Sequence, residues 1–212
     1  MLAGALCVLA AMLLVMQGLL LVDGSLGHPA GLRQACIPLA FALTAGPFLL
    51  WTLRRPGEGR RWLRLGAPAA GTAGRLARIA VLGMVAVWAT ALLCTLLPGY
   101  RQLVAAQADL GGWRTAGGLA RAVVFLAAMP AFFEELYFRG YLMDRLERAW
   151  GPRAALVGQA ALFAPLHGPA APVAAAVGLV NGCLARTGRS LWPGIVLHFL
   201  NNLAVVAALR AR

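Results

Sequence analysis

The sequence contains no lysine and few acidic residues. Its 212 residues include 19 arginines against 7 aspartates and glutamates, which gives a formal net charge of +12. Such a charge is typical of nucleic-acid binders, but these arginines fall between apolar segments, where they orient membrane proteins. The most arginine-rich loop also has only one aromatic residue, Trp62, for stacking on bases. We therefore expect no nucleic-acid partner.

Cysteine is scarce, and its spacing excludes both a CxxC motif and a cysteine-based zinc site. The four cysteines are scattered through apolar runs, with no CxxC pair and no spacing suited to zinc: Cys7, Cys36, Cys94 and Cys183. Buried, unreactive thiols are the expectation for such positions.

Charged residues of either sign make up only 12% of the chain, whereas 61% is hydrophobic. The mean hydropathy is +0.76, and soluble domains have about 45–50% apolar and about 25% charged residues. We therefore expect an integral membrane protein in contact with the lipid bilayer. Abundant arginine and alanine without lysine indicate a high-GC bacterial source, and hence the bacterial cytoplasmic (inner) membrane.

Several apolar segments are long enough to cross a bilayer as helices, which takes roughly 17–25 residues. The first has no basic leader, and its apolar run exceeds the roughly 7–15 residues of a signal-peptide core, so we expect a retained anchor. The fold class predicted is all-α: a polytopic transmembrane helical bundle of about 6–8 membrane helices, in which the fifth and sixth are short enough to be tilted or re-entrant. The segments are 2–22, 35–53, 76–98, 119–148, a fifth that ends near 167, 172–185 and 192–209.

The arginines are distributed unevenly between the predicted loops. Residues 54–75, the turn at 145–153, and Arg186 with Arg189 alternate so that they reach the same side, and the remaining loops have few arginines. Because positive loops face the cytoplasm, we expect the N-terminus to be cytoplasmic.

Two adjacent glutamates interrupt the fourth apolar segment, in the stretch FFEELYFRG. Glu135 and Arg139 are four residues apart, so they share a helix face and can pair. Glu134 is turned about 100° away and has no local partner. Charged groups inside a membrane are candidates for function by default, and here one carboxylate is predicted to be structural and the other reactive.

Two further polar sites lie in apolar segments. Phe163 and His167 are four residues apart in LFAPLHG, where Pro165 kinks the helix. His198 and Asn202 have the same spacing in HFLNN. In an antiparallel hairpin that turns near residues 150–151, Glu134 and His167 lie at similar depth. We therefore predict that the three sites converge.

Each of these sites also has a plainer interpretation. A single membrane histidine is usually a hydrogen-bonded packing residue, Phe163 packs, and an asparagine such as Asn202 holds helices together. A lone glutamate also suits a proton or ion path. A non-catalytic membrane protein, serving ion movement, immunity or partner binding, is therefore the alternative to an enzyme.

Taken together, the three sites resemble the motifs of a known family. The order EE-x3-R, F-x3-H, H-x3-N is similar to that of the CPBP (CAAX protease and bacteriocin-processing, or Abi) family of intramembrane glutamic or metalloproteases, which are related to type II CAAX prenyl endopeptidases. The phrase TGRSLWPGIVLHFLNN is similar to its third-motif context. The resemblance divides the chain into variable N-terminal helices, 1–118, and a catalytic helical core, 119–212.

The resemblance implies a water-accessible polar cavity and hydrolysis of a peptide bond near the membrane surface. By position, Glu134 corresponds to the catalytic glutamate, His167 to its partner on the water, and His198 with Asn202 to the pair that faces the oxyanion. The supporting residues are Glu135, Arg139 and Phe163. The implied partner is a membrane-anchored peptide or protein substrate, and neither its identity nor its cleavage site follows from these residues.

A metal-dependent version uses some of the same residues. Glu134, His167 and His198 form a set of two histidines and one carboxylate, which is a catalytic zinc pattern. The sequence contains no HExxH, and with Glu134 as a ligand no general base remains, because Glu135 is tied to Arg139. We therefore favour the glutamate–water mechanism without a required cofactor, with a divalent metal such as zinc as the alternative.

Overall fold

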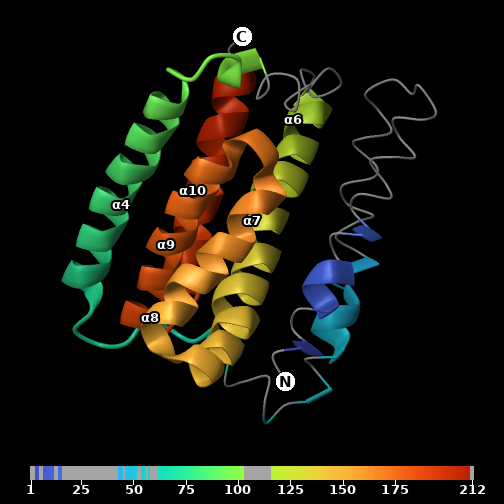
Figure 1. Ribbon diagram of the computed structural model, residues 1–212, viewed down its shortest axis with the longest axis vertical. Coiled ribbons are helices and arrows are strands. Elements are labelled where there is room, and N and C mark those ends of the chain that lie inside the picture. Colours follow the sequence, from blue (N-terminus) through green and yellow to red (C-terminus); the bar gives the residue numbers. More distant parts are fainter. Residues whose placement is uncertain are drawn as a thin grey trace.

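The computed structural model of the protein describes most of the second half of the chain and parts of the first half. The described residues are 3–4, 7–11, 14–15, 43–44, 46–51, 54–55, 57, 62–102 and 116–210. All regular structure within these ranges is helical (Figure 1), so the all-α prediction is confirmed for them. The predicted spans 2–22 and 35–53 lie largely outside the described residues, although their described positions are helical.

The helices follow the predicted order closely. The third predicted span corresponds to α4 (Ala73–Cys94), the sixth to α9 (Ala171–Gly188) and the seventh to α10 (Trp192–Arg210). The fourth is a continuous helical rod, but two of its sections are π-helical, which the sequence pattern did not predict. Its sections are α6 (Ala116–Ala122), π-helical η1 (Val123–Ala128), α7 (Met129–Glu134), π-helical η2 (Glu135–Leu142) and the start of α8 (Met143–Phe163).

Two glycines reverse the chain on either side of the fifth predicted helix. Gly151 has φ 81° and ψ 171°, so α8 consists of two helices joined at this residue. After Phe163 the helix tightens into the 3₁₀ segment η3 (Ala164–Ala170), which Gly168 breaks with φ 52°. A positive φ is accessible to glycine at little cost, so both predicted breaks are confirmed.

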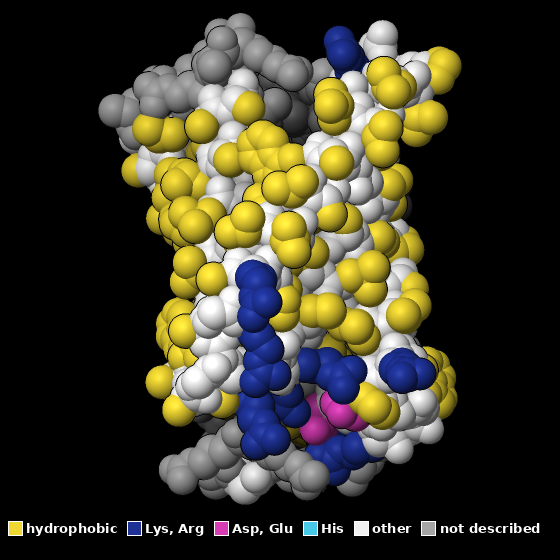
Figure 2. Space-filling view, turned by 90° about the vertical axis from the view of Figure 1, so that its left-hand side faces the viewer, with side chains coloured by type: hydrophobic (Ala, Val, Ile, Leu, Met, Phe, Trp, Pro, Cys, Tyr) yellow, Lys and Arg dark blue, Asp and Glu magenta, His cyan; other side chains and the backbone are white. Residues whose placement is uncertain are grey.

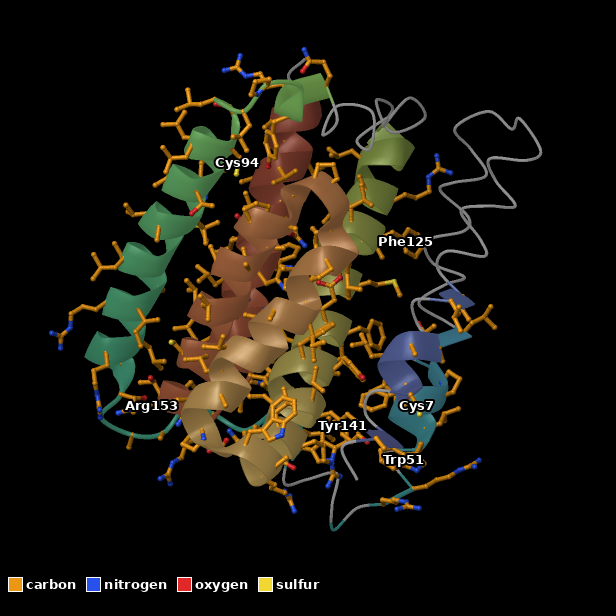
Figure 3. The ribbon with its side chains drawn as sticks, in the orientation of Figure 1. Cys7, Trp51, Cys94, Phe125, Tyr141 and Arg153 are labelled. Atoms are coloured by element: carbon orange, nitrogen blue, oxygen red, sulfur yellow. The ribbon has the colours of Figure 1, made fainter. Side chains whose placement is uncertain are left out.

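The helix α9 lies at the centre of the described bundle. It contacts α4, α8 and α10, and α10 also lies against η1 and α7 (Figure 1). The core under η2 is extended by an aromatic cluster that includes residues from the first half of the chain: Phe48, Trp51, Trp62, Tyr137 and Tyr141. Figure 3 shows Trp51 and Tyr141 on facing elements. Aromatic residues from the first half of the chain thus pack against the predicted helix 119–148.

The three arginine-bearing loops meet at one end of the bundle. The carbonyl of Arg64 accepts a hydrogen bond from the amide of Leu191 (3.0 Å), and Arg186 donates to the carbonyl of Pro152 (2.6 Å). Arg153 lies at the opposite end from Cys94 (Figure 3). The predicted grouping of these loops is confirmed, and their position on the cytoplasmic side stays a prediction.

One helix among the described residues, α4, is long and apolar enough to cross a membrane by length and composition. A shorter apolar helix follows at Trp192–Ala208. The cysteine expectation is confirmed at Cys94, which is buried, but it is wrong at Cys7, which is exposed.

Candidate active site

The predicted pair of Glu135 and Arg139 is present and completely buried. Nη1 of Arg139 lies 3.1 Å from Oε1 of Glu135, and both side chains are 0% exposed. The guanidinium also lies over the ring of Phe163, with Cζ 4.2 Å from the ring centroid. This cation–π contact compensates in part for hydrogen bonds that the guanidinium does not make with described residues.

Glu135 connects three helical elements through the same oxygen. Besides Arg139, Oε1 accepts a hydrogen bond from Nδ2 of Asn181 on α9 (2.8 Å). It also lies 2.9 Å from Nδ1 of His198 on α10. Because all these groups are buried, the carboxylate is both a charge partner and the hydrogen-bond centre of the site.

Glu134 has quite different surroundings. Its side chain is 18% exposed, and Oε2 lies 3.7 Å from Nε2 of His198, beyond hydrogen-bonding distance. Oε2 has no hydrogen-bond partner among the described residues. The structure therefore brings Glu134, Glu135 and His198 together, as predicted, and leaves Glu134 as the less constrained carboxylate.

The ring of His198 lies between the two glutamates, with one nitrogen toward each. The carboxylate of Glu135, charged opposite Arg139, accepts hydrogen bonds only, so Nδ1 of His198 is assigned as the donor. In a neutral ring Nε2 is then an acceptor. Donation from Nε2 to an oxyanion therefore requires the doubly protonated ring, a condition that helical spacing alone does not reveal.

Phe163 lies at the centre of the predicted site. Its ring centroid is 4.4 Å from that of His167 and 6.2 Å from that of His198. The prediction that Phe163 packs is therefore confirmed, and its partners are the two histidines and Arg139. Phe163 thereby fixes the spacing between the second and third polar sites.

His167 and Asn202 are the least constrained of the predicted residues. His167 is half-buried, and Nδ1 lies 3.2 Å from the carbonyl oxygen of Phe163. Asn202 is half-buried on α10, one helical turn after His198, and its side chain has no hydrogen bond with the described residues. No hydrogen bond or ion pair within the described ranges joins either residue to Glu134. Both retain polar atoms that a bound substrate or water can use.

The set proposed for zinc fits this arrangement in the orientation of its histidines but not in its spacing. His198 directs Nδ1 toward Glu135 and His167 directs Nδ1 toward the carbonyl of Phe163, which leaves each Nε2 available, as in metal-bound histidines. Within the described part of the chain, no three histidine, cysteine, aspartate or glutamate side chains are grouped to hold a metal ion. The described geometry thus offers no ready ligand set from Glu134, His167 and His198.

Two buried polar residues were missed by the sequence analysis. Asn181 donates to Glu135, and Gln159 on α8 donates to the carbonyls of Leu156 and Gly178 (3.0 and 2.8 Å). Each is a polar residue in an apolar segment, which was the signal available. Neither lies four residues from another polar group on its own helix, so the four-residue spacing that predicts the other sites does not identify these two.

The site and fold define a class: a helical protein in which a glutamate pair, His198 and Asn181 meet among apolar helices, with His167 and His198 on either side of Phe163. Residues 116–204 match the family model described as type II CAAX prenyl endopeptidase Rce1-like. This segment, which is less than half of the chain, contains all three motifs and confirms the resemblance to the CPBP family, which is a membrane-associated protease family. No curated protein matches the chain, and no solved structure does.

Proposed function

We propose that the protein is an intramembrane endopeptidase that hydrolyses a peptide bond of a membrane-associated peptide or protein with a water activated by Glu134. The observation that carries the proposal is the asymmetry of the glutamate pair. Glu135 is fully buried, and its Oε1 meets Arg139, Asn181 and His198, whereas Glu134 is 18% exposed and its Oε2 has no hydrogen-bond partner in the described part of the chain. The family match supports protease chemistry in general.

The membrane setting is supported by the surface of the described helices. Leu82 on α4 is 68% exposed and Leu200 on α10 is 50% exposed, and apolar faces of this kind mark contact with a membrane or a partner. On the face shown in Figure 2, most of the arginine side chains gather toward one end, and hydrophobic side chains are spread over much of the described surface beyond them. A multi-pass protein of the bacterial inner membrane, with its arginine-rich end in the cytoplasm, accounts for both features.

In the proposed mechanism, Glu134 accepts a proton from water as the oxygen attacks the carbonyl carbon of the scissile bond. General-base catalysis of this kind typically contributes about 10²–10⁴-fold. Asn202, and His198 when doubly protonated, donate hydrogen bonds to the oxyanion that forms. His167 transfers a proton to the leaving nitrogen as the C–N bond breaks, and the proton that Glu134 accepted from water then replaces it, so that a carboxylate and an amine are released and both side chains are restored.

The catalytic core and the variable N-terminal part have separate roles in this proposal. Residues 119–212 supply every group that takes part in the reaction, and the helices within 1–118 complete the enclosure. The aromatic contact of Phe48 with Tyr137, at 5.4 Å between ring centroids, joins the two parts. In this proposal the first part shapes access to the site, and the reacting groups come from the second.

The proposal is tested by replacing Glu134. Purified wild-type protein and Glu134→Ala are incubated with bacterial membranes, and released peptides are identified by mass spectrometry. Glu147→Ala is the matched control, because Glu147 is an acid on the adjoining helix α8 outside the site. Peptides released by the wild type and by Glu147→Ala, but not by folded Glu134→Ala, are expected. Normal cleavage by Glu134→Ala would overturn the assignment, and proton flux lost in Glu134→Gln without cleavage would favour an ion path.

The role of metal has its own test. Glu134 as a general base predicts activity that survives strong chelators and a purified protein without stoichiometric zinc. Chelator-sensitive cleavage that zinc restores would instead show that Glu134 belongs to a ligand set.

A further inference from the structure

Asn181 is a buried amide that belongs to none of the three motifs. It lies in the middle of α9, is 1% exposed, and contacts a residue 46 positions away through the 2.8 Å bond to Oε1 of Glu135. A buried asparagine between membrane helices is usually worth only a little stability. Its partner here is the group that also holds His198, which raises the question of a second role.

The hydrogen bonds to Glu135 are distributed unevenly over its two oxygens. The donors on Arg139, Asn181 and His198 all meet Oε1, and Oε2 has no hydrogen-bond partner within the described ranges. The terminal torsion of a glutamate is broad and nearly two-fold, so the chain alone does not fix its orientation. The donor from Asn181 comes from a different helix than the other two and defines which way the carboxylate is turned.

The backbone of α10 is placed directly against this pair. A Cβ added at Gly194 would lie 3.1 Å from Oε2 of Glu135 and 3.6 Å from Cβ of Asn181. Gly194 stands one helical turn before His198 on the same face. The close approach of Gly194 to the Glu135–Asn181 pair therefore helps to set the position and rotation of His198. A side chain at Gly194 would push α10 away from this pair.

We infer that Asn181 is a positioning residue that holds the carboxylate of Glu135 so that Nδ1 of His198 is bound and Nε2 faces Glu134. It acts through Glu135 and does not touch the substrate. The catalytic consequence rests on the proposed function, whereas the effect on the imidazole does not. In other enzymes, loss of the hydrogen-bond partner that orients a metal-bound histidine lowers metal affinity or activity roughly 10–100-fold. Reacting side chains in general depend on such partners for their orientation.

The first test reads the imidazole directly. The chain has three histidines, so protein labelled with nitrogen-15 histidine gives few ring signals, which His28→Gln and His167→Gln assign. We expect His198 to be protonated at Nδ1 in the wild type. Asn181→Leu, which keeps the size and removes the donor, is expected to shift the His198 signals and leave those of His167 in place.

The matched control is Gln159→Met. Gln159 is also a fully buried amide, but it donates to backbone carbonyls on α8 and α9. Its replacement is expected to lower stability without moving the His198 signals. If Asn181→Leu does not fold, Asn181→Ala removes the same donor with less bulk. Unchanged His198 signals in a folded Asn181 variant overturn the inference whatever the activity.

The second test reads the reaction. Asn181→Leu is expected to lower kcat roughly tenfold with KM unchanged, because ground-state contacts with substrate are not altered. A kcat within twofold of wild type, while Glu134→Ala is inactive, overturns the catalytic role of Asn181. Shifted His198 signals in a protein whose cleavage does not depend on Glu134 would support the positioning of the ring and reject the proposed function.

Discussion

Two carboxylates that are neighbours in the sequence occupy opposite kinds of environment. Glu135 is 0% exposed and is held by three donors from η2, α9 and α10. Glu134 is 18% exposed, and its Oε2 lies 3.7 Å from Nε2 of His198. One step along a helix thus changes the surroundings of a carboxylate from fully buried, with one oxygen engaged by three groups, to partly exposed.

The difference teaches how the two roles are kept apart. His198 lies between the glutamates and is asymmetric, because Nδ1 is engaged by Glu135 and Nε2 faces Glu134. Arg139 forms its direct ion pair with Glu135. Glu135 therefore fixes the geometry, and the partly exposed Glu134 is the carboxylate that water can reach.

Exchanging each acid for its amide is the strongest way to break this comparison. Glu135→Gln is expected to lower the free energy of unfolding by roughly 3–5 kcal/mol, because Arg139 is left buried without an opposite charge. Glu134→Gln is expected to change it by less than about 1 kcal/mol, since no hydrogen bond among described residues is lost at Oε2. Unfolding of the detergent-solubilised proteins measures both, and equal losses would contradict the division of roles.

Asn202 sharpens the comparison. Asn202→Ala is expected to raise the activation free energy of cleavage by about 2.7–4 kcal/mol, the usual cost of one oxyanion donor. Its stability should hardly change, because its side chain makes no hydrogen bond with the described residues. Cleavage rates of a peptide identified as a substrate measure the effect. A stable Asn202→Ala that cleaves at the normal rate would remove Asn202 from the oxyanion site.

A smaller effect is expected where α10 approaches Glu135. Gly194→Ala places a methyl group 3.1 Å from Oε2 of Glu135, and overpacking of this kind costs about 1–3 kcal/mol. The loss should appear in the unfolding curve. The control is Val196→Ala, at an exposed position on the same helix. If Gly194→Ala is as stable as Val196→Ala, the close approach does not constrain α10.

The smallest effect is expected at a second pair with the same spacing. Arg148 and Asp144 are four residues apart, with Nη2 2.9 Å from Oδ2, but Arg148 is 41% exposed. Surface ion pairs contribute about 0–1 kcal/mol, so Arg148→Gln should leave unfolding nearly unchanged. A loss as large as that of Glu135→Gln would show that spacing, and not burial, decides the value of these pairs.

Helical periodicity and breakers were enough to predict much of the described fold. The GP dipeptide at 151–152 predicted the reversal at Gly151, and the turn before Trp192 predicted the start of α10. Spacing of four residues predicted the pair of Glu135 and Arg139. These features depend on groups within one helix, where sequence distance determines spatial distance.

Contacts between helices were the part that the sequence could not supply. Asn181 donates a hydrogen bond from α9 to Glu135. The ring of Phe163 contacts both histidines and lies under the guanidinium of Arg139. Such contacts depend on the rotation and height of each helix relative to the others, which local spacing does not encode. The π-helical turn at η2 also alters the rotation that an ideal helix predicts.

The most direct measurement follows the oxygen of the attacking water. Purified wild-type protein and Glu134→Gln are incubated with bacterial membranes in water enriched in oxygen-18, and released peptides are analysed by mass spectrometry. The account predicts peptides with one oxygen-18 atom at the new C-terminus in the wild type, and their loss in folded Glu134→Gln. The same labelled peptides, released at the same rate by Glu134→Gln, would contradict it.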